Sequence, residues 1–451
     1  MSQKLELRRF ASDSSYNFIR QGWALGLGLL ISVLLSRGLG TEGRGIYSVV
    51  LLLPTFLVTF LNLGIGPATA YYVGRDPTRM TAILRNNLAL SIWISAFSIV
   101  SGALLILFAG QTLLPGAPQA LLLLSLAAIP ITLQQSFLIT IFQGLEDFKA
   151  YNLVLMTPHL MMLALVISFI WLIPMGVLGA IIAYIGGNLT SVVVAGILLW
   201  RRAAGESIFT LKVERSYARE MLNYGLRSHF ANILAFFNYR ADVFLLNLLA
   251  GAGPVGVYSV AVAIGERLWL LPNSVSTVLL PRIASMEGSE KERKLLTPMM
   301  SRYVLWFSLL LAIPAFLLAK WGIVLLYSEE FAQSALALRL LLPGIVAMSV
   351  TKILANDISG RGHPGINSYQ SAVAFAVNVI LNLFLIPRFG VSGVAVASSI
   401  SYSLLAILKI ITYFRMTNVS LRKILLLDTD DIKRIYRNTA ALAVEANNRK
   451  K

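Results

Sequence analysis

The sequence of 451 residues contains no cysteine, which excludes disulfide bonds, thiolate catalysis and cysteine-based metal sites. Only three histidines are present, and no two of them have the spacing of metal ligands. His159, His229 and His363 are therefore interpreted as packing or surface residues. The chain also lacks a Gly-rich loop of the P-loop form, so ATP is not expected to drive it directly.

Charged residues are scarce as well. They make up 13% of the chain, against about 25% in a typical soluble domain, while the apolar share reaches 57%. The mean hydropathy is +0.74. The apolar residues occur in runs of roughly 20, the length that a helix needs to cross a bilayer. This composition excludes a disordered chain, disfavours a soluble enzyme and indicates a polytopic membrane protein.

About twelve apolar segments predict an all-α membrane protein with about twelve transmembrane helices. The segments lie at about 15–36, 46–71, 86–109, 119–142, 151–173, 176–200, 227–250, 255–280, 302–327, 332–356, 366–386 and 391–413. Turn signals at Pro174-Met175-Gly176 and Gly251-Ala252-Gly253-Pro254 separate the closest pairs.

Basic residues concentrate in alternate loops and at both termini, and the formal net charge is +17. The other loops and their flanks hold only Arg37, Arg44, Lys320, Arg339 and Arg388. Because cytoplasmic loops are enriched in lysine and arginine, both termini are predicted to lie in the cytoplasm, with the protein in the cytoplasmic membrane. Topology thus explains the positive charge, and no nucleic-acid partner is expected.

A polar linker divides the chain into two predicted lobes. The N-terminal six-helix lobe covers 1–205, the cytoplasmic linker 206–226, the C-terminal six-helix lobe 227–415 and a basic tail 416–451. The tail is compatible with an interfacial helix and with a solvated extension, and both readings stay open. The predicted non-cytoplasmic loops are too short to fold into a catalytic domain, so an enzyme is not expected.

Two short motifs recur at nearly the same offset. The segment Gly45-Ile46-Tyr47-Ser48-Val49 recurs as Gly256-Val257-Tyr258-Ser259-Val260, and Gly176-Val177 recurs as Gly390-Val391. These matches predict duplicated six-span halves related by an axis along the membrane normal, as in many secondary transporters.

Ionisable residues inside the predicted spans are the candidate functional residues, because a charge at mid-bilayer costs about 2.5–3.5 kcal/mol on insertion scales. They are Arg20, Arg240, Asp242, Glu266, Arg267 and Lys352. The alternative is structural pairing within the membrane, for example of Arg240 with Glu266. Helical spacing adds Asn273 to a polar stripe that includes Glu266. The excess of cations suits phosphate, whose oxygens the arginine fork binds in pairs.

Several glycine-based motifs, taken in order, resemble the polysaccharide flippase family of the MATE-like multidrug, oligosaccharidyl-lipid and polysaccharide exporter superfamily. They are Arg37-Gly38-Leu39-Gly40-Thr41-Glu42-Gly43-Arg44-Gly45-Ile46-Tyr47, Asn62-Leu63-Gly64-Ile65-Gly66, the 144–151 loop, Gly256-Val257-Tyr258 with Pro281, and 378–383 leading to Pro387 and Gly390-Val391-Ser392-Gly393. The resemblance extends over about residues 10–415.

The resemblance implies two six-helix lobes that form a V around a central cavity. It also implies transport of a polyprenyl-diphosphate-linked oligosaccharide, with membrane lipids and the polysaccharide polymerase machinery as partners. In such proteins cations of the first helix and the second lobe are thought to hold the diphosphate, and Arg20, Arg240 and Arg267 match that role by position. The chain departs from the pattern of proton-coupled drug exporters, because the acid on its first helix, Asp13, lies at the very start.

We therefore hypothesise a lipid-linked oligosaccharide flippase that works by alternating access and needs no cofactor. Arg240 and Arg267 would bind the diphosphate, and Arg20 would guide it in. Lys352 and Asn273 would complete the substrate cavity. Asp242 or Glu266 would couple transport to an Na⁺ or H⁺ gradient.

Three alternatives stay open at this point. The first is a MATE-like, ion-coupled multidrug or small-molecule antiporter on the same fold. The second is a membrane glycan polymerase or ligase, which generally needs a substantial external loop that this chain lacks. The third is a scaffold in which the buried charges are fully paired.

Overall fold

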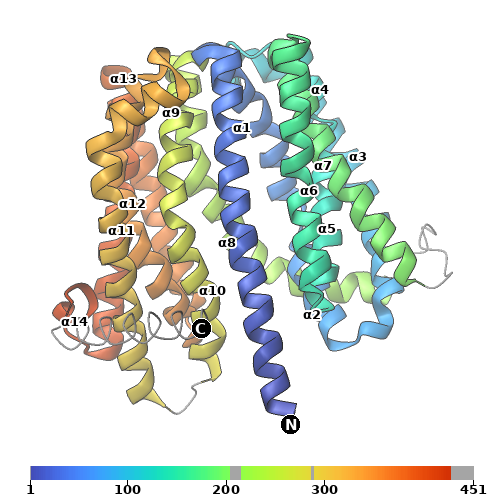
Figure 1. The fold of residues 1–451 in the computed structure, drawn as a ribbon, viewed down its shortest axis with the longest axis vertical. Coiled ribbons are helices and arrows are strands. Elements are labelled where there is room, and N and C mark those ends of the chain that lie inside the picture. Colours follow the sequence, from blue (N-terminus) through green and yellow to red (C-terminus); the bar gives the residue numbers. More distant parts are fainter. Residues whose placement is uncertain (1, 204–214, 286–288, 428–451) are drawn as a thin grey trace, which may run out of the picture. The chain divides into compact units, whose positions relative to one another are not determined.

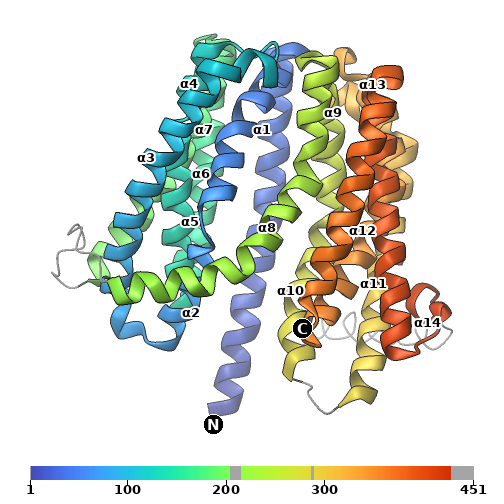
Figure 2. The ribbon, with the colours of Figure 1, turned by 180° about the vertical axis from the view of Figure 1, so that it is seen from behind.

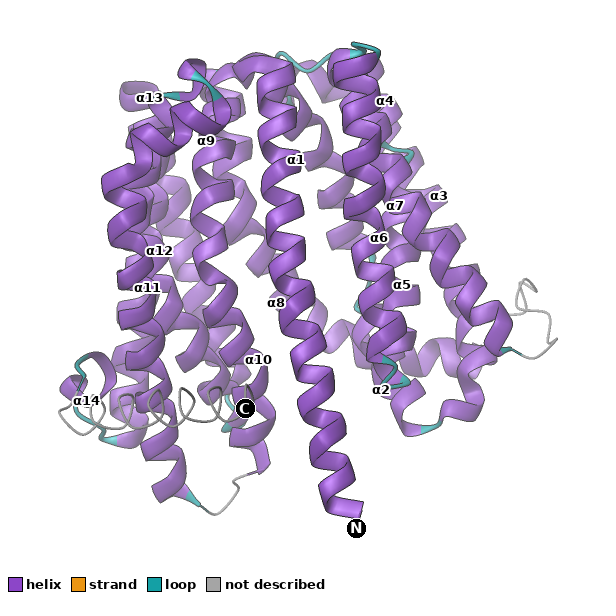
Figure 3. Cartoon of the chain, viewed as in Figure 1, coloured by secondary structure: helices purple, strands orange, loops and turns teal. Residues whose placement is uncertain are grey.

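The structure, a computed structural model, describes residues 2–203, 215–285 and 289–427, and the side chains of residues 2–21 and of some residues within 215–235 and 277–285 are not part of that description. Every regular element in these ranges is helical, as Figure 3 shows. The elements are α1 (Ser2–Leu61), α2 (Ile65–Arg75), η1 (Pro77–Arg79), α3 (Met80–Leu113), α4 (Gln119–Ser125), α5 (Ala128–Gly144), α6 (Phe148–Val166), η2 (Ile167–Leu172), α7 (Gly176–Arg202), α8 (Arg215–Ala250), α9 (Ala252–Gly265), η3 (Glu266–Trp269), α10 (Leu270–Ser285), α11 (Glu290–Tyr327), η4 (Glu329–Phe331), α12 (Gln333–Gly360), α13 (Pro364–Thr417) and α14 (Leu421–Leu425). The prediction of an all-α protein is confirmed.

Nine helices within the described ranges are long and apolar enough to span a membrane. Two of these, α1 and α13, are broken internally at Gly40 (φ 67°) and Gly390 (φ 52°). Positive φ is readily available only to glycine, and both glycines lie between spans that the sequence predicts separately. The multi-pass membrane fold is confirmed, while the count of twelve helices stays a prediction.

The predicted span at 46–71 is interrupted. The Asn62 side chain accepts a hydrogen bond from the Gly64 N–H at 2.9 Å, and Leu63 and Gly64 have φ of 53° and 70°. This turn ends α1 and starts α2. Hydropathy cannot reveal it, because apolar residues continue on both sides, but asparagine followed by glycine at short range is a turn signal.

The chain divides into two compact units. Unit 1 comprises residues 1–264, 320–337 and 378–395, and unit 2 comprises residues 265–319, 338–377 and 396–451. The predicted lobes at 1–205 and 227–415 follow different criteria, the polar linker and the internal repeat, and they stay a prediction.

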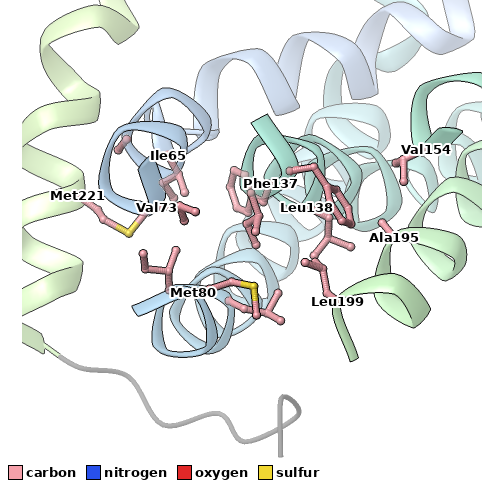
Figure 4. Packing of buried hydrophobic residues seen from close by; sticks show 14 of the residues in the cluster. Ile65, Val73, Met80, Phe137, Leu138, Val154, Ala195, Leu199 and Met221 are labelled. Carbon is pink, nitrogen blue, oxygen red and sulfur yellow. The ribbon is translucent and has the colours of Figure 1, made fainter. Parts of the chain in front are cut away.

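Unit 1 has a hydrophobic core shared by six helices (Figure 4). The core includes Val73 of α2, Phe137 of α5, Leu199 of α7 and Met221 of α8, all fully buried. Met221 falls in the segment that the sequence assigns to a polar linker. Residues 215–226 of that segment form the beginning of α8, and Met221 contributes to the core, while the linker assignment stays a prediction.

The helix α8 is anchored to α1 and α2 by close backbone contacts. A Cβ atom on Gly64 would overlap the backbone of Gly225, and one on Gly225 would overlap the backbone of Leu63 and Gly64. Nearby, the His229 ring nitrogen Nε2 lies 2.7 Å from the carbonyl oxygen of Phe60. Figure 2 shows the first part of α8 lying across the end of α2 before the helix bends away.

The two copies of the Gly-X-Tyr-Ser motif pack directly against each other in unit 1. A Cβ on Gly45 would overlap the carbonyl of Ala252, and a Cβ on Gly256 would overlap the carbonyl of Thr41. Each glycine therefore permits a backbone contact that no other residue allows. This reciprocal contact joins the two copies of the motif, while the duplication of six-span halves stays a prediction.

Unit 2 contains the described part of the predicted tail. The short helix α14, visible near one end of α13 in Figure 1, places Ile424 in a cluster with Val350, Leu354 and Tyr413. The Arg302 and Trp306 side chains of α11 donate hydrogen bonds of 2.9 Å to the carbonyls of Lys423 and Leu425. Residues 428–451 of the tail lie outside the described residues.

Candidate functional site

Asp242 of α8 is a buried carboxylate with two identified donors. Its side chain is 3% exposed. The Tyr258 hydroxyl donates to one carboxylate oxygen at 2.5 Å, and the Val243 N–H donates to the other at 2.7 Å. Tyr258 belongs to the repeated motif and is fully buried. A carboxylate held in this way is stabilised by short hydrogen bonds rather than by water.

Arg240 lies on a different face of α8. Residues two apart on a helix do not face each other, so Arg240 and Asp242 point in different directions. Arg240 shares its face with Phe236 and Phe237, which lie four and three residues earlier, respectively. Those two rings lie 6.0 and 5.5 Å from Phe56 and Phe60 of α1, respectively, so this face of α8 packs against α1. The Arg240 guanidinium is half-buried and donates to the Tyr239 carbonyl at 3.3 Å.

In unit 2 the structure brings two of the predicted residues together. The Lys352 ammonium of α12 lies 4.7 Å from the centroid of the Trp269 ring, and it interacts electrostatically with Glu266. Trp269 is 5% exposed and is fixed by a 2.9 Å hydrogen bond from its indole N–H to the Ile345 carbonyl. Tyr402 packs edge-on against the indole with ring centroids 5.8 Å apart. We call Lys352, Trp269 and Glu266 the Lys352 cluster.

The Lys352 cluster forms at a break in the helix. Residues 266–269 adopt a 3₁₀ turn between α9 and α10. Pro272 explains the break, because it lacks the N–H that would bond to the carbonyl of Leu268. A 3₁₀ turn advances about 120° per residue rather than about 100°, so four residues shift the helical phase by about 80°. The stripe predicted to join Ser259, Glu266 and Asn273 assumed an unbroken helix.

The other predicted residues are placed as follows. Arg267 is half-buried on the 3₁₀ turn, and Asn273 is exposed on α10. The Arg20 side chain lies outside the described residues. Arg240 and Asp242 belong to unit 1, whereas Glu266, Arg267, Asn273 and Lys352 belong to unit 2. Within the described ranges, no group of three His, Asp or Glu residues is placed to hold a metal ion.

A second charged cluster in unit 2 is paired throughout. The fully buried Asp357 accepts a 2.5 Å hydrogen bond from the Thr297 hydroxyl, and it forms an ion pair with Arg361. Arg361 also contacts Glu290 at 2.8 Å. These contacts tie the ends of α11 and α12 together, which is a structural role. Arg361 also lies over the Tyr413 ring, with 5.9 Å between its Cζ atom and the ring centroid, so both clusters include a cation–π contact.

Sequence reasoning missed both aromatic partners. Asp242 and Tyr258 lie at equal distances along the chain from Ala250, next to the Gly251 turn, so a helical hairpin places them side by side. This equal spacing about the turn could have predicted the contact between Asp242 and Tyr258 from the sequence. The contact between Trp269 and Lys352 joins helical segments that are distant in the sequence, so no local sequence pattern predicts it.

Solved structures with similar folds are membrane transporters. One is described as "Inward-facing conformation of a multidrug resistance MATE family transporter of the MOP superfamily", with a TM-score of 0.71, 19% identity and coverage of 87% of this chain and 94% of that one. Another is "Lipid II flippase MurJ, inward closed conformation", with a TM-score of 0.70, 14% identity and coverage of 89% and 87%. The fold and the membrane-embedded charges thus define a multi-pass membrane protein of the MATE and MurJ transporter fold.

Residues 10–287 match the polysaccharide biosynthesis protein family, and residues 228–384 match the MatE family. The chain belongs to the polysaccharide biosynthesis protein family, as its glycine motifs suggested.

Named relatives are archaeal. The chain is 26% identical over 199 residues to the "Probable low-salt glycan biosynthesis flippase Agl15" of Haloferax volcanii, which covers 42% of this chain and 41% of that protein. It is 27% identical over 248 residues to the "Probable flippase AglR" of the same organism, covering 50% and 47%. An uncharacterised membrane protein of Methanocaldococcus jannaschii is 23% identical over 86% of this chain and 94% of its own length. The chain thus spans less than half the length of the two flippases it matches.

Proposed function

We propose that the protein is a flippase that moves a polyprenyl-diphosphate-linked oligosaccharide across the cytoplasmic membrane for cell-surface polysaccharide biosynthesis. The names of the two haloarchaeal relatives and of the MurJ neighbour support this substrate class. The glycan lipid crosses the membrane chemically unchanged, so the protein acts as a transporter by alternating access and not as an enzyme. The polymerase machinery that consumes the glycan would be a partner.

The Lys352 cluster is the observation that carries the proposal. A lysine at the centre of a membrane-spanning helix costs about 2.5–3.5 kcal/mol on insertion scales, and Lys352, near the predicted cytoplasmic end of its span, bears part of that cost. A cation–π contact in a desolvated site returns up to about 2 kcal/mol, and the Glu266 carboxylate adds attraction. A charge supported in this way is suited to a diphosphate, which would compete with Glu266 for the ammonium.

The remaining predicted residues take the roles assigned from the sequence. Arg240, Arg267 and Asn273 would contact the diphosphate and the sugar, and Arg20 would admit the headgroup. Asp242 is the better candidate for coupling to H⁺ or Na⁺, because its carboxylate is buried and is held by Tyr258. Glu266 would couple transport only through its exchange with the substrate. No cofactor is needed.

Orientation is part of the same proposal. The distribution of lysine and arginine supports cytoplasmic termini, with which the substrate would be loaded from the inner leaflet. Reporter fusions after Thr417 and within the loop at 328–332 should report cytoplasmic and non-cytoplasmic locations, respectively. The reverse pattern would contradict the direction of transport.

Replacing Lys352 tests the site. We expect Lys352→Met to cause accumulation of the lipid-linked glycan at normal protein abundance, because the neutral side chain cannot attract the diphosphate. Lys409→Met is the matched control. Lys409 is also a lysine of a membrane-spanning helix, but its side chain is buried, whereas Lys352 is half-buried, and it bonds to the neutral Asn367 side chain. Equal glycan accumulation in both variants, or none in either, would remove Lys352 from the substrate site.

A multidrug antiporter is the second candidate, favoured by the match of residues 228–384 to the MatE family and by the MATE fold. Overexpression in a drug-sensitive host distinguishes the two functions. An antiporter raises resistance to lipophilic cations in an ion-dependent manner and leaves the lipid-linked glycan pool unchanged.

A further inference from the structure

The short helix α14 packs one side chain into unit 2 and leaves other apolar side chains exposed. Ile424 is fully buried in the cluster that contains Tyr413. Leu421 and Leu426, by contrast, are each 50% exposed. Single exposed leucines are ordinary on a protein surface, but two on so short a segment, beside other exposed apolar side chains, indicate contact with something other than water.

Hydrogen bonds from α11 hold α14 in place through its backbone. The Arg302 guanidinium and the Trp306 indole donate to the carbonyls of Lys423 and Leu425, respectively. The carbonyls in the last turn of a helix have no partner within the helix, so these donors satisfy acceptors that would otherwise need water. The described part of the tail is therefore docked on unit 2 and does not extend freely from α13.

The helix α14 lies at the level where the exposed apolar surface of unit 2 ends. On α13 the exposed Ile411 and Phe414 are followed directly by the exposed Arg415. On α11 Trp306 is exposed, and Leu310, one turn further along the helix, is exposed as well. A change from apolar to charged side chains on the outside of a membrane-spanning helix marks the membrane surface, where tryptophan is also enriched. Both helices therefore place α14 at the interface between lipid and water.

The charged residues of this segment are all positive. Arg415, Arg422 and Lys423 are exposed, and no aspartate or glutamate occurs within residues 415–427. Exposed leucine and tryptophan together with lysine and arginine are the composition of segments that lie in the membrane interface. Cations at this level are attracted to the phosphates of an anionic leaflet. We call Leu421, Leu426, Arg415, Arg422 and Lys423 the α14 patch.

We propose that the α14 patch binds the membrane surface at the predicted cytoplasmic end of the protein and recognises anionic phospholipid headgroups there. Leu421 and Leu426 enter the headgroup region, and Arg422 and Lys423 contact the phosphates. The sequence leaves two readings of the tail open, an interfacial helix and a solvated extension, and the proposal selects the first for residues 420–426. It involves no residue of the proposed substrate site and does not depend on the flippase function.

The absence of cysteine allows a fluorophore to be attached at one chosen position of the full-length protein. Leu421→Cys and Leu426→Cys each carry a nitrobenzoxadiazole label, and both positions are exposed, so the label leaves the packing of Ile424 intact. Lys291→Cys, exposed at the beginning of α11, is the control in water. The labelled proteins are placed in nanodiscs, where doxyl groups on lipid chains quench a label in the bilayer and iodide quenches a label in water.

We expect doxyl lipid to quench the labels at positions 421 and 426, and iodide to quench the label at position 291. Iodide quenching of all three labels to the same extent would overturn the proposal, because the segment would then be a solvated extension. Labels at 421 and 426 that neither quencher reaches would also overturn it, because a protein segment would then cover the α14 patch.

Lipid recognition is measured with the same label at position 426. Nanodiscs of phosphatidylcholine contain a small share of either doxyl-phosphatidylglycerol or doxyl-phosphatidylcholine, and the two quenching curves give the relative association constant of the anionic lipid. We expect this constant to favour phosphatidylglycerol. Arg422→Gln combined with Lys423→Gln should lower it by about fivefold or more. Equal association of the two lipids with the unsubstituted patch would contradict the proposal.

A second pair of substitutions controls for the loss of charge itself. Lys291→Gln combined with Lys294→Gln also removes two cations from unit 2, but these lie beside Glu290 and Glu292 at the beginning of α11. The relative association constant should not change in this variant. Equal losses in the two double variants would indicate attraction to the overall charge of the protein, and the α14 patch would then not be a site of lipid recognition.

Discussion

The two copies of the Gly-X-Tyr-Ser motif share a backbone contact but differ in what surrounds their tyrosines. Gly45 and Gly256 pack against each other's helices with no room for a Cβ atom. Beside them, Tyr47 offers its ring to the Arg44 guanidinium at 5.4 Å, whereas Tyr258 offers its hydroxyl to the Asp242 carboxylate at 2.5 Å. One repeated tyrosine thus faces a cation and the other faces an anion.

The glycine contact is therefore a structural feature that both copies share, whereas the tyrosine environments are specific to each copy. The glycine contact is the same in both copies, because it depends only on the backbone and holds the duplicated helices together. The tyrosine environments depend on Arg44 and Asp242, which the repeat does not share. A duplicated element can keep its packing while each copy acquires a different charge, and only the buried acid has a role in the proposed coupling.

The largest effect is expected when the shared contact is broken. Gly45→Ala and Gly256→Ala each place a Cβ against a backbone carbonyl, and overpacking of this kind costs about 1–3 kcal/mol or more. Gly253→Ala is the control, since a Cβ there meets nothing within 4 Å. Thermal unfolding of the purified protein measures the effect. A melting temperature equal to that of Gly253→Ala in either glycine variant would refute the reciprocal contact.

The tyrosines should then respond unequally. Tyr258→Phe removes a donor from a buried carboxylate, and leaving such a group short of a partner costs about 1–3 kcal/mol. Tyr47→Phe keeps the ring and therefore the contact with Arg44, so we expect a change below about 0.5 kcal/mol. Denaturant or thermal unfolding of the two variants makes the comparison. Equal losses of stability would mean that the two environments do not differ as described.

The smallest expected effect concerns the cation itself. A double-mutant cycle of Arg44→Gln with Tyr47→Leu should yield a coupling energy of about 0.5–1 kcal/mol, the usual size of a cation–π contact. The corresponding cycle of Asp242→Asn with Tyr258→Phe should give a larger coupling, because that hydrogen bond is charged and buried. A coupling energy of zero between Arg44 and Tyr47 would mean that only the copy with the Tyr258–Asp242 hydrogen bond has a stabilising charged contact.

Much of the fold follows from patterns that are local in sequence. Long apolar runs predicted the membrane helices, and Gly40 and Gly390, where α1 and α13 break, lie between spans that those runs separate. The repeated motif predicted duplication, and its two glycines meet in space. These features depend on hydropathy or on the absence of a Cβ atom, both of which can be read from one sequence.

The missed features depend on contacts between distant segments. Met221 lies in a polar stretch, and only packing against α2 shows that the helix begins there and is buried. No local pattern singles out Trp269, because its contact with Lys352 joins residues 83 positions apart in the chain. The 3₁₀ turn follows from Pro272, a signal that the search for a polar stripe on an unbroken helix overlooked.

The most direct measurement of the proposed function is the pool of lipid-linked glycan after depletion of this protein in its own host. If the protein is a flippase, a finished polyprenyl-diphosphate oligosaccharide accumulates on the cytoplasmic face, and the surface polysaccharide declines in parallel. An unchanged pool with an intact surface polysaccharide, in a strain without other members of the family, would contradict the flippase function.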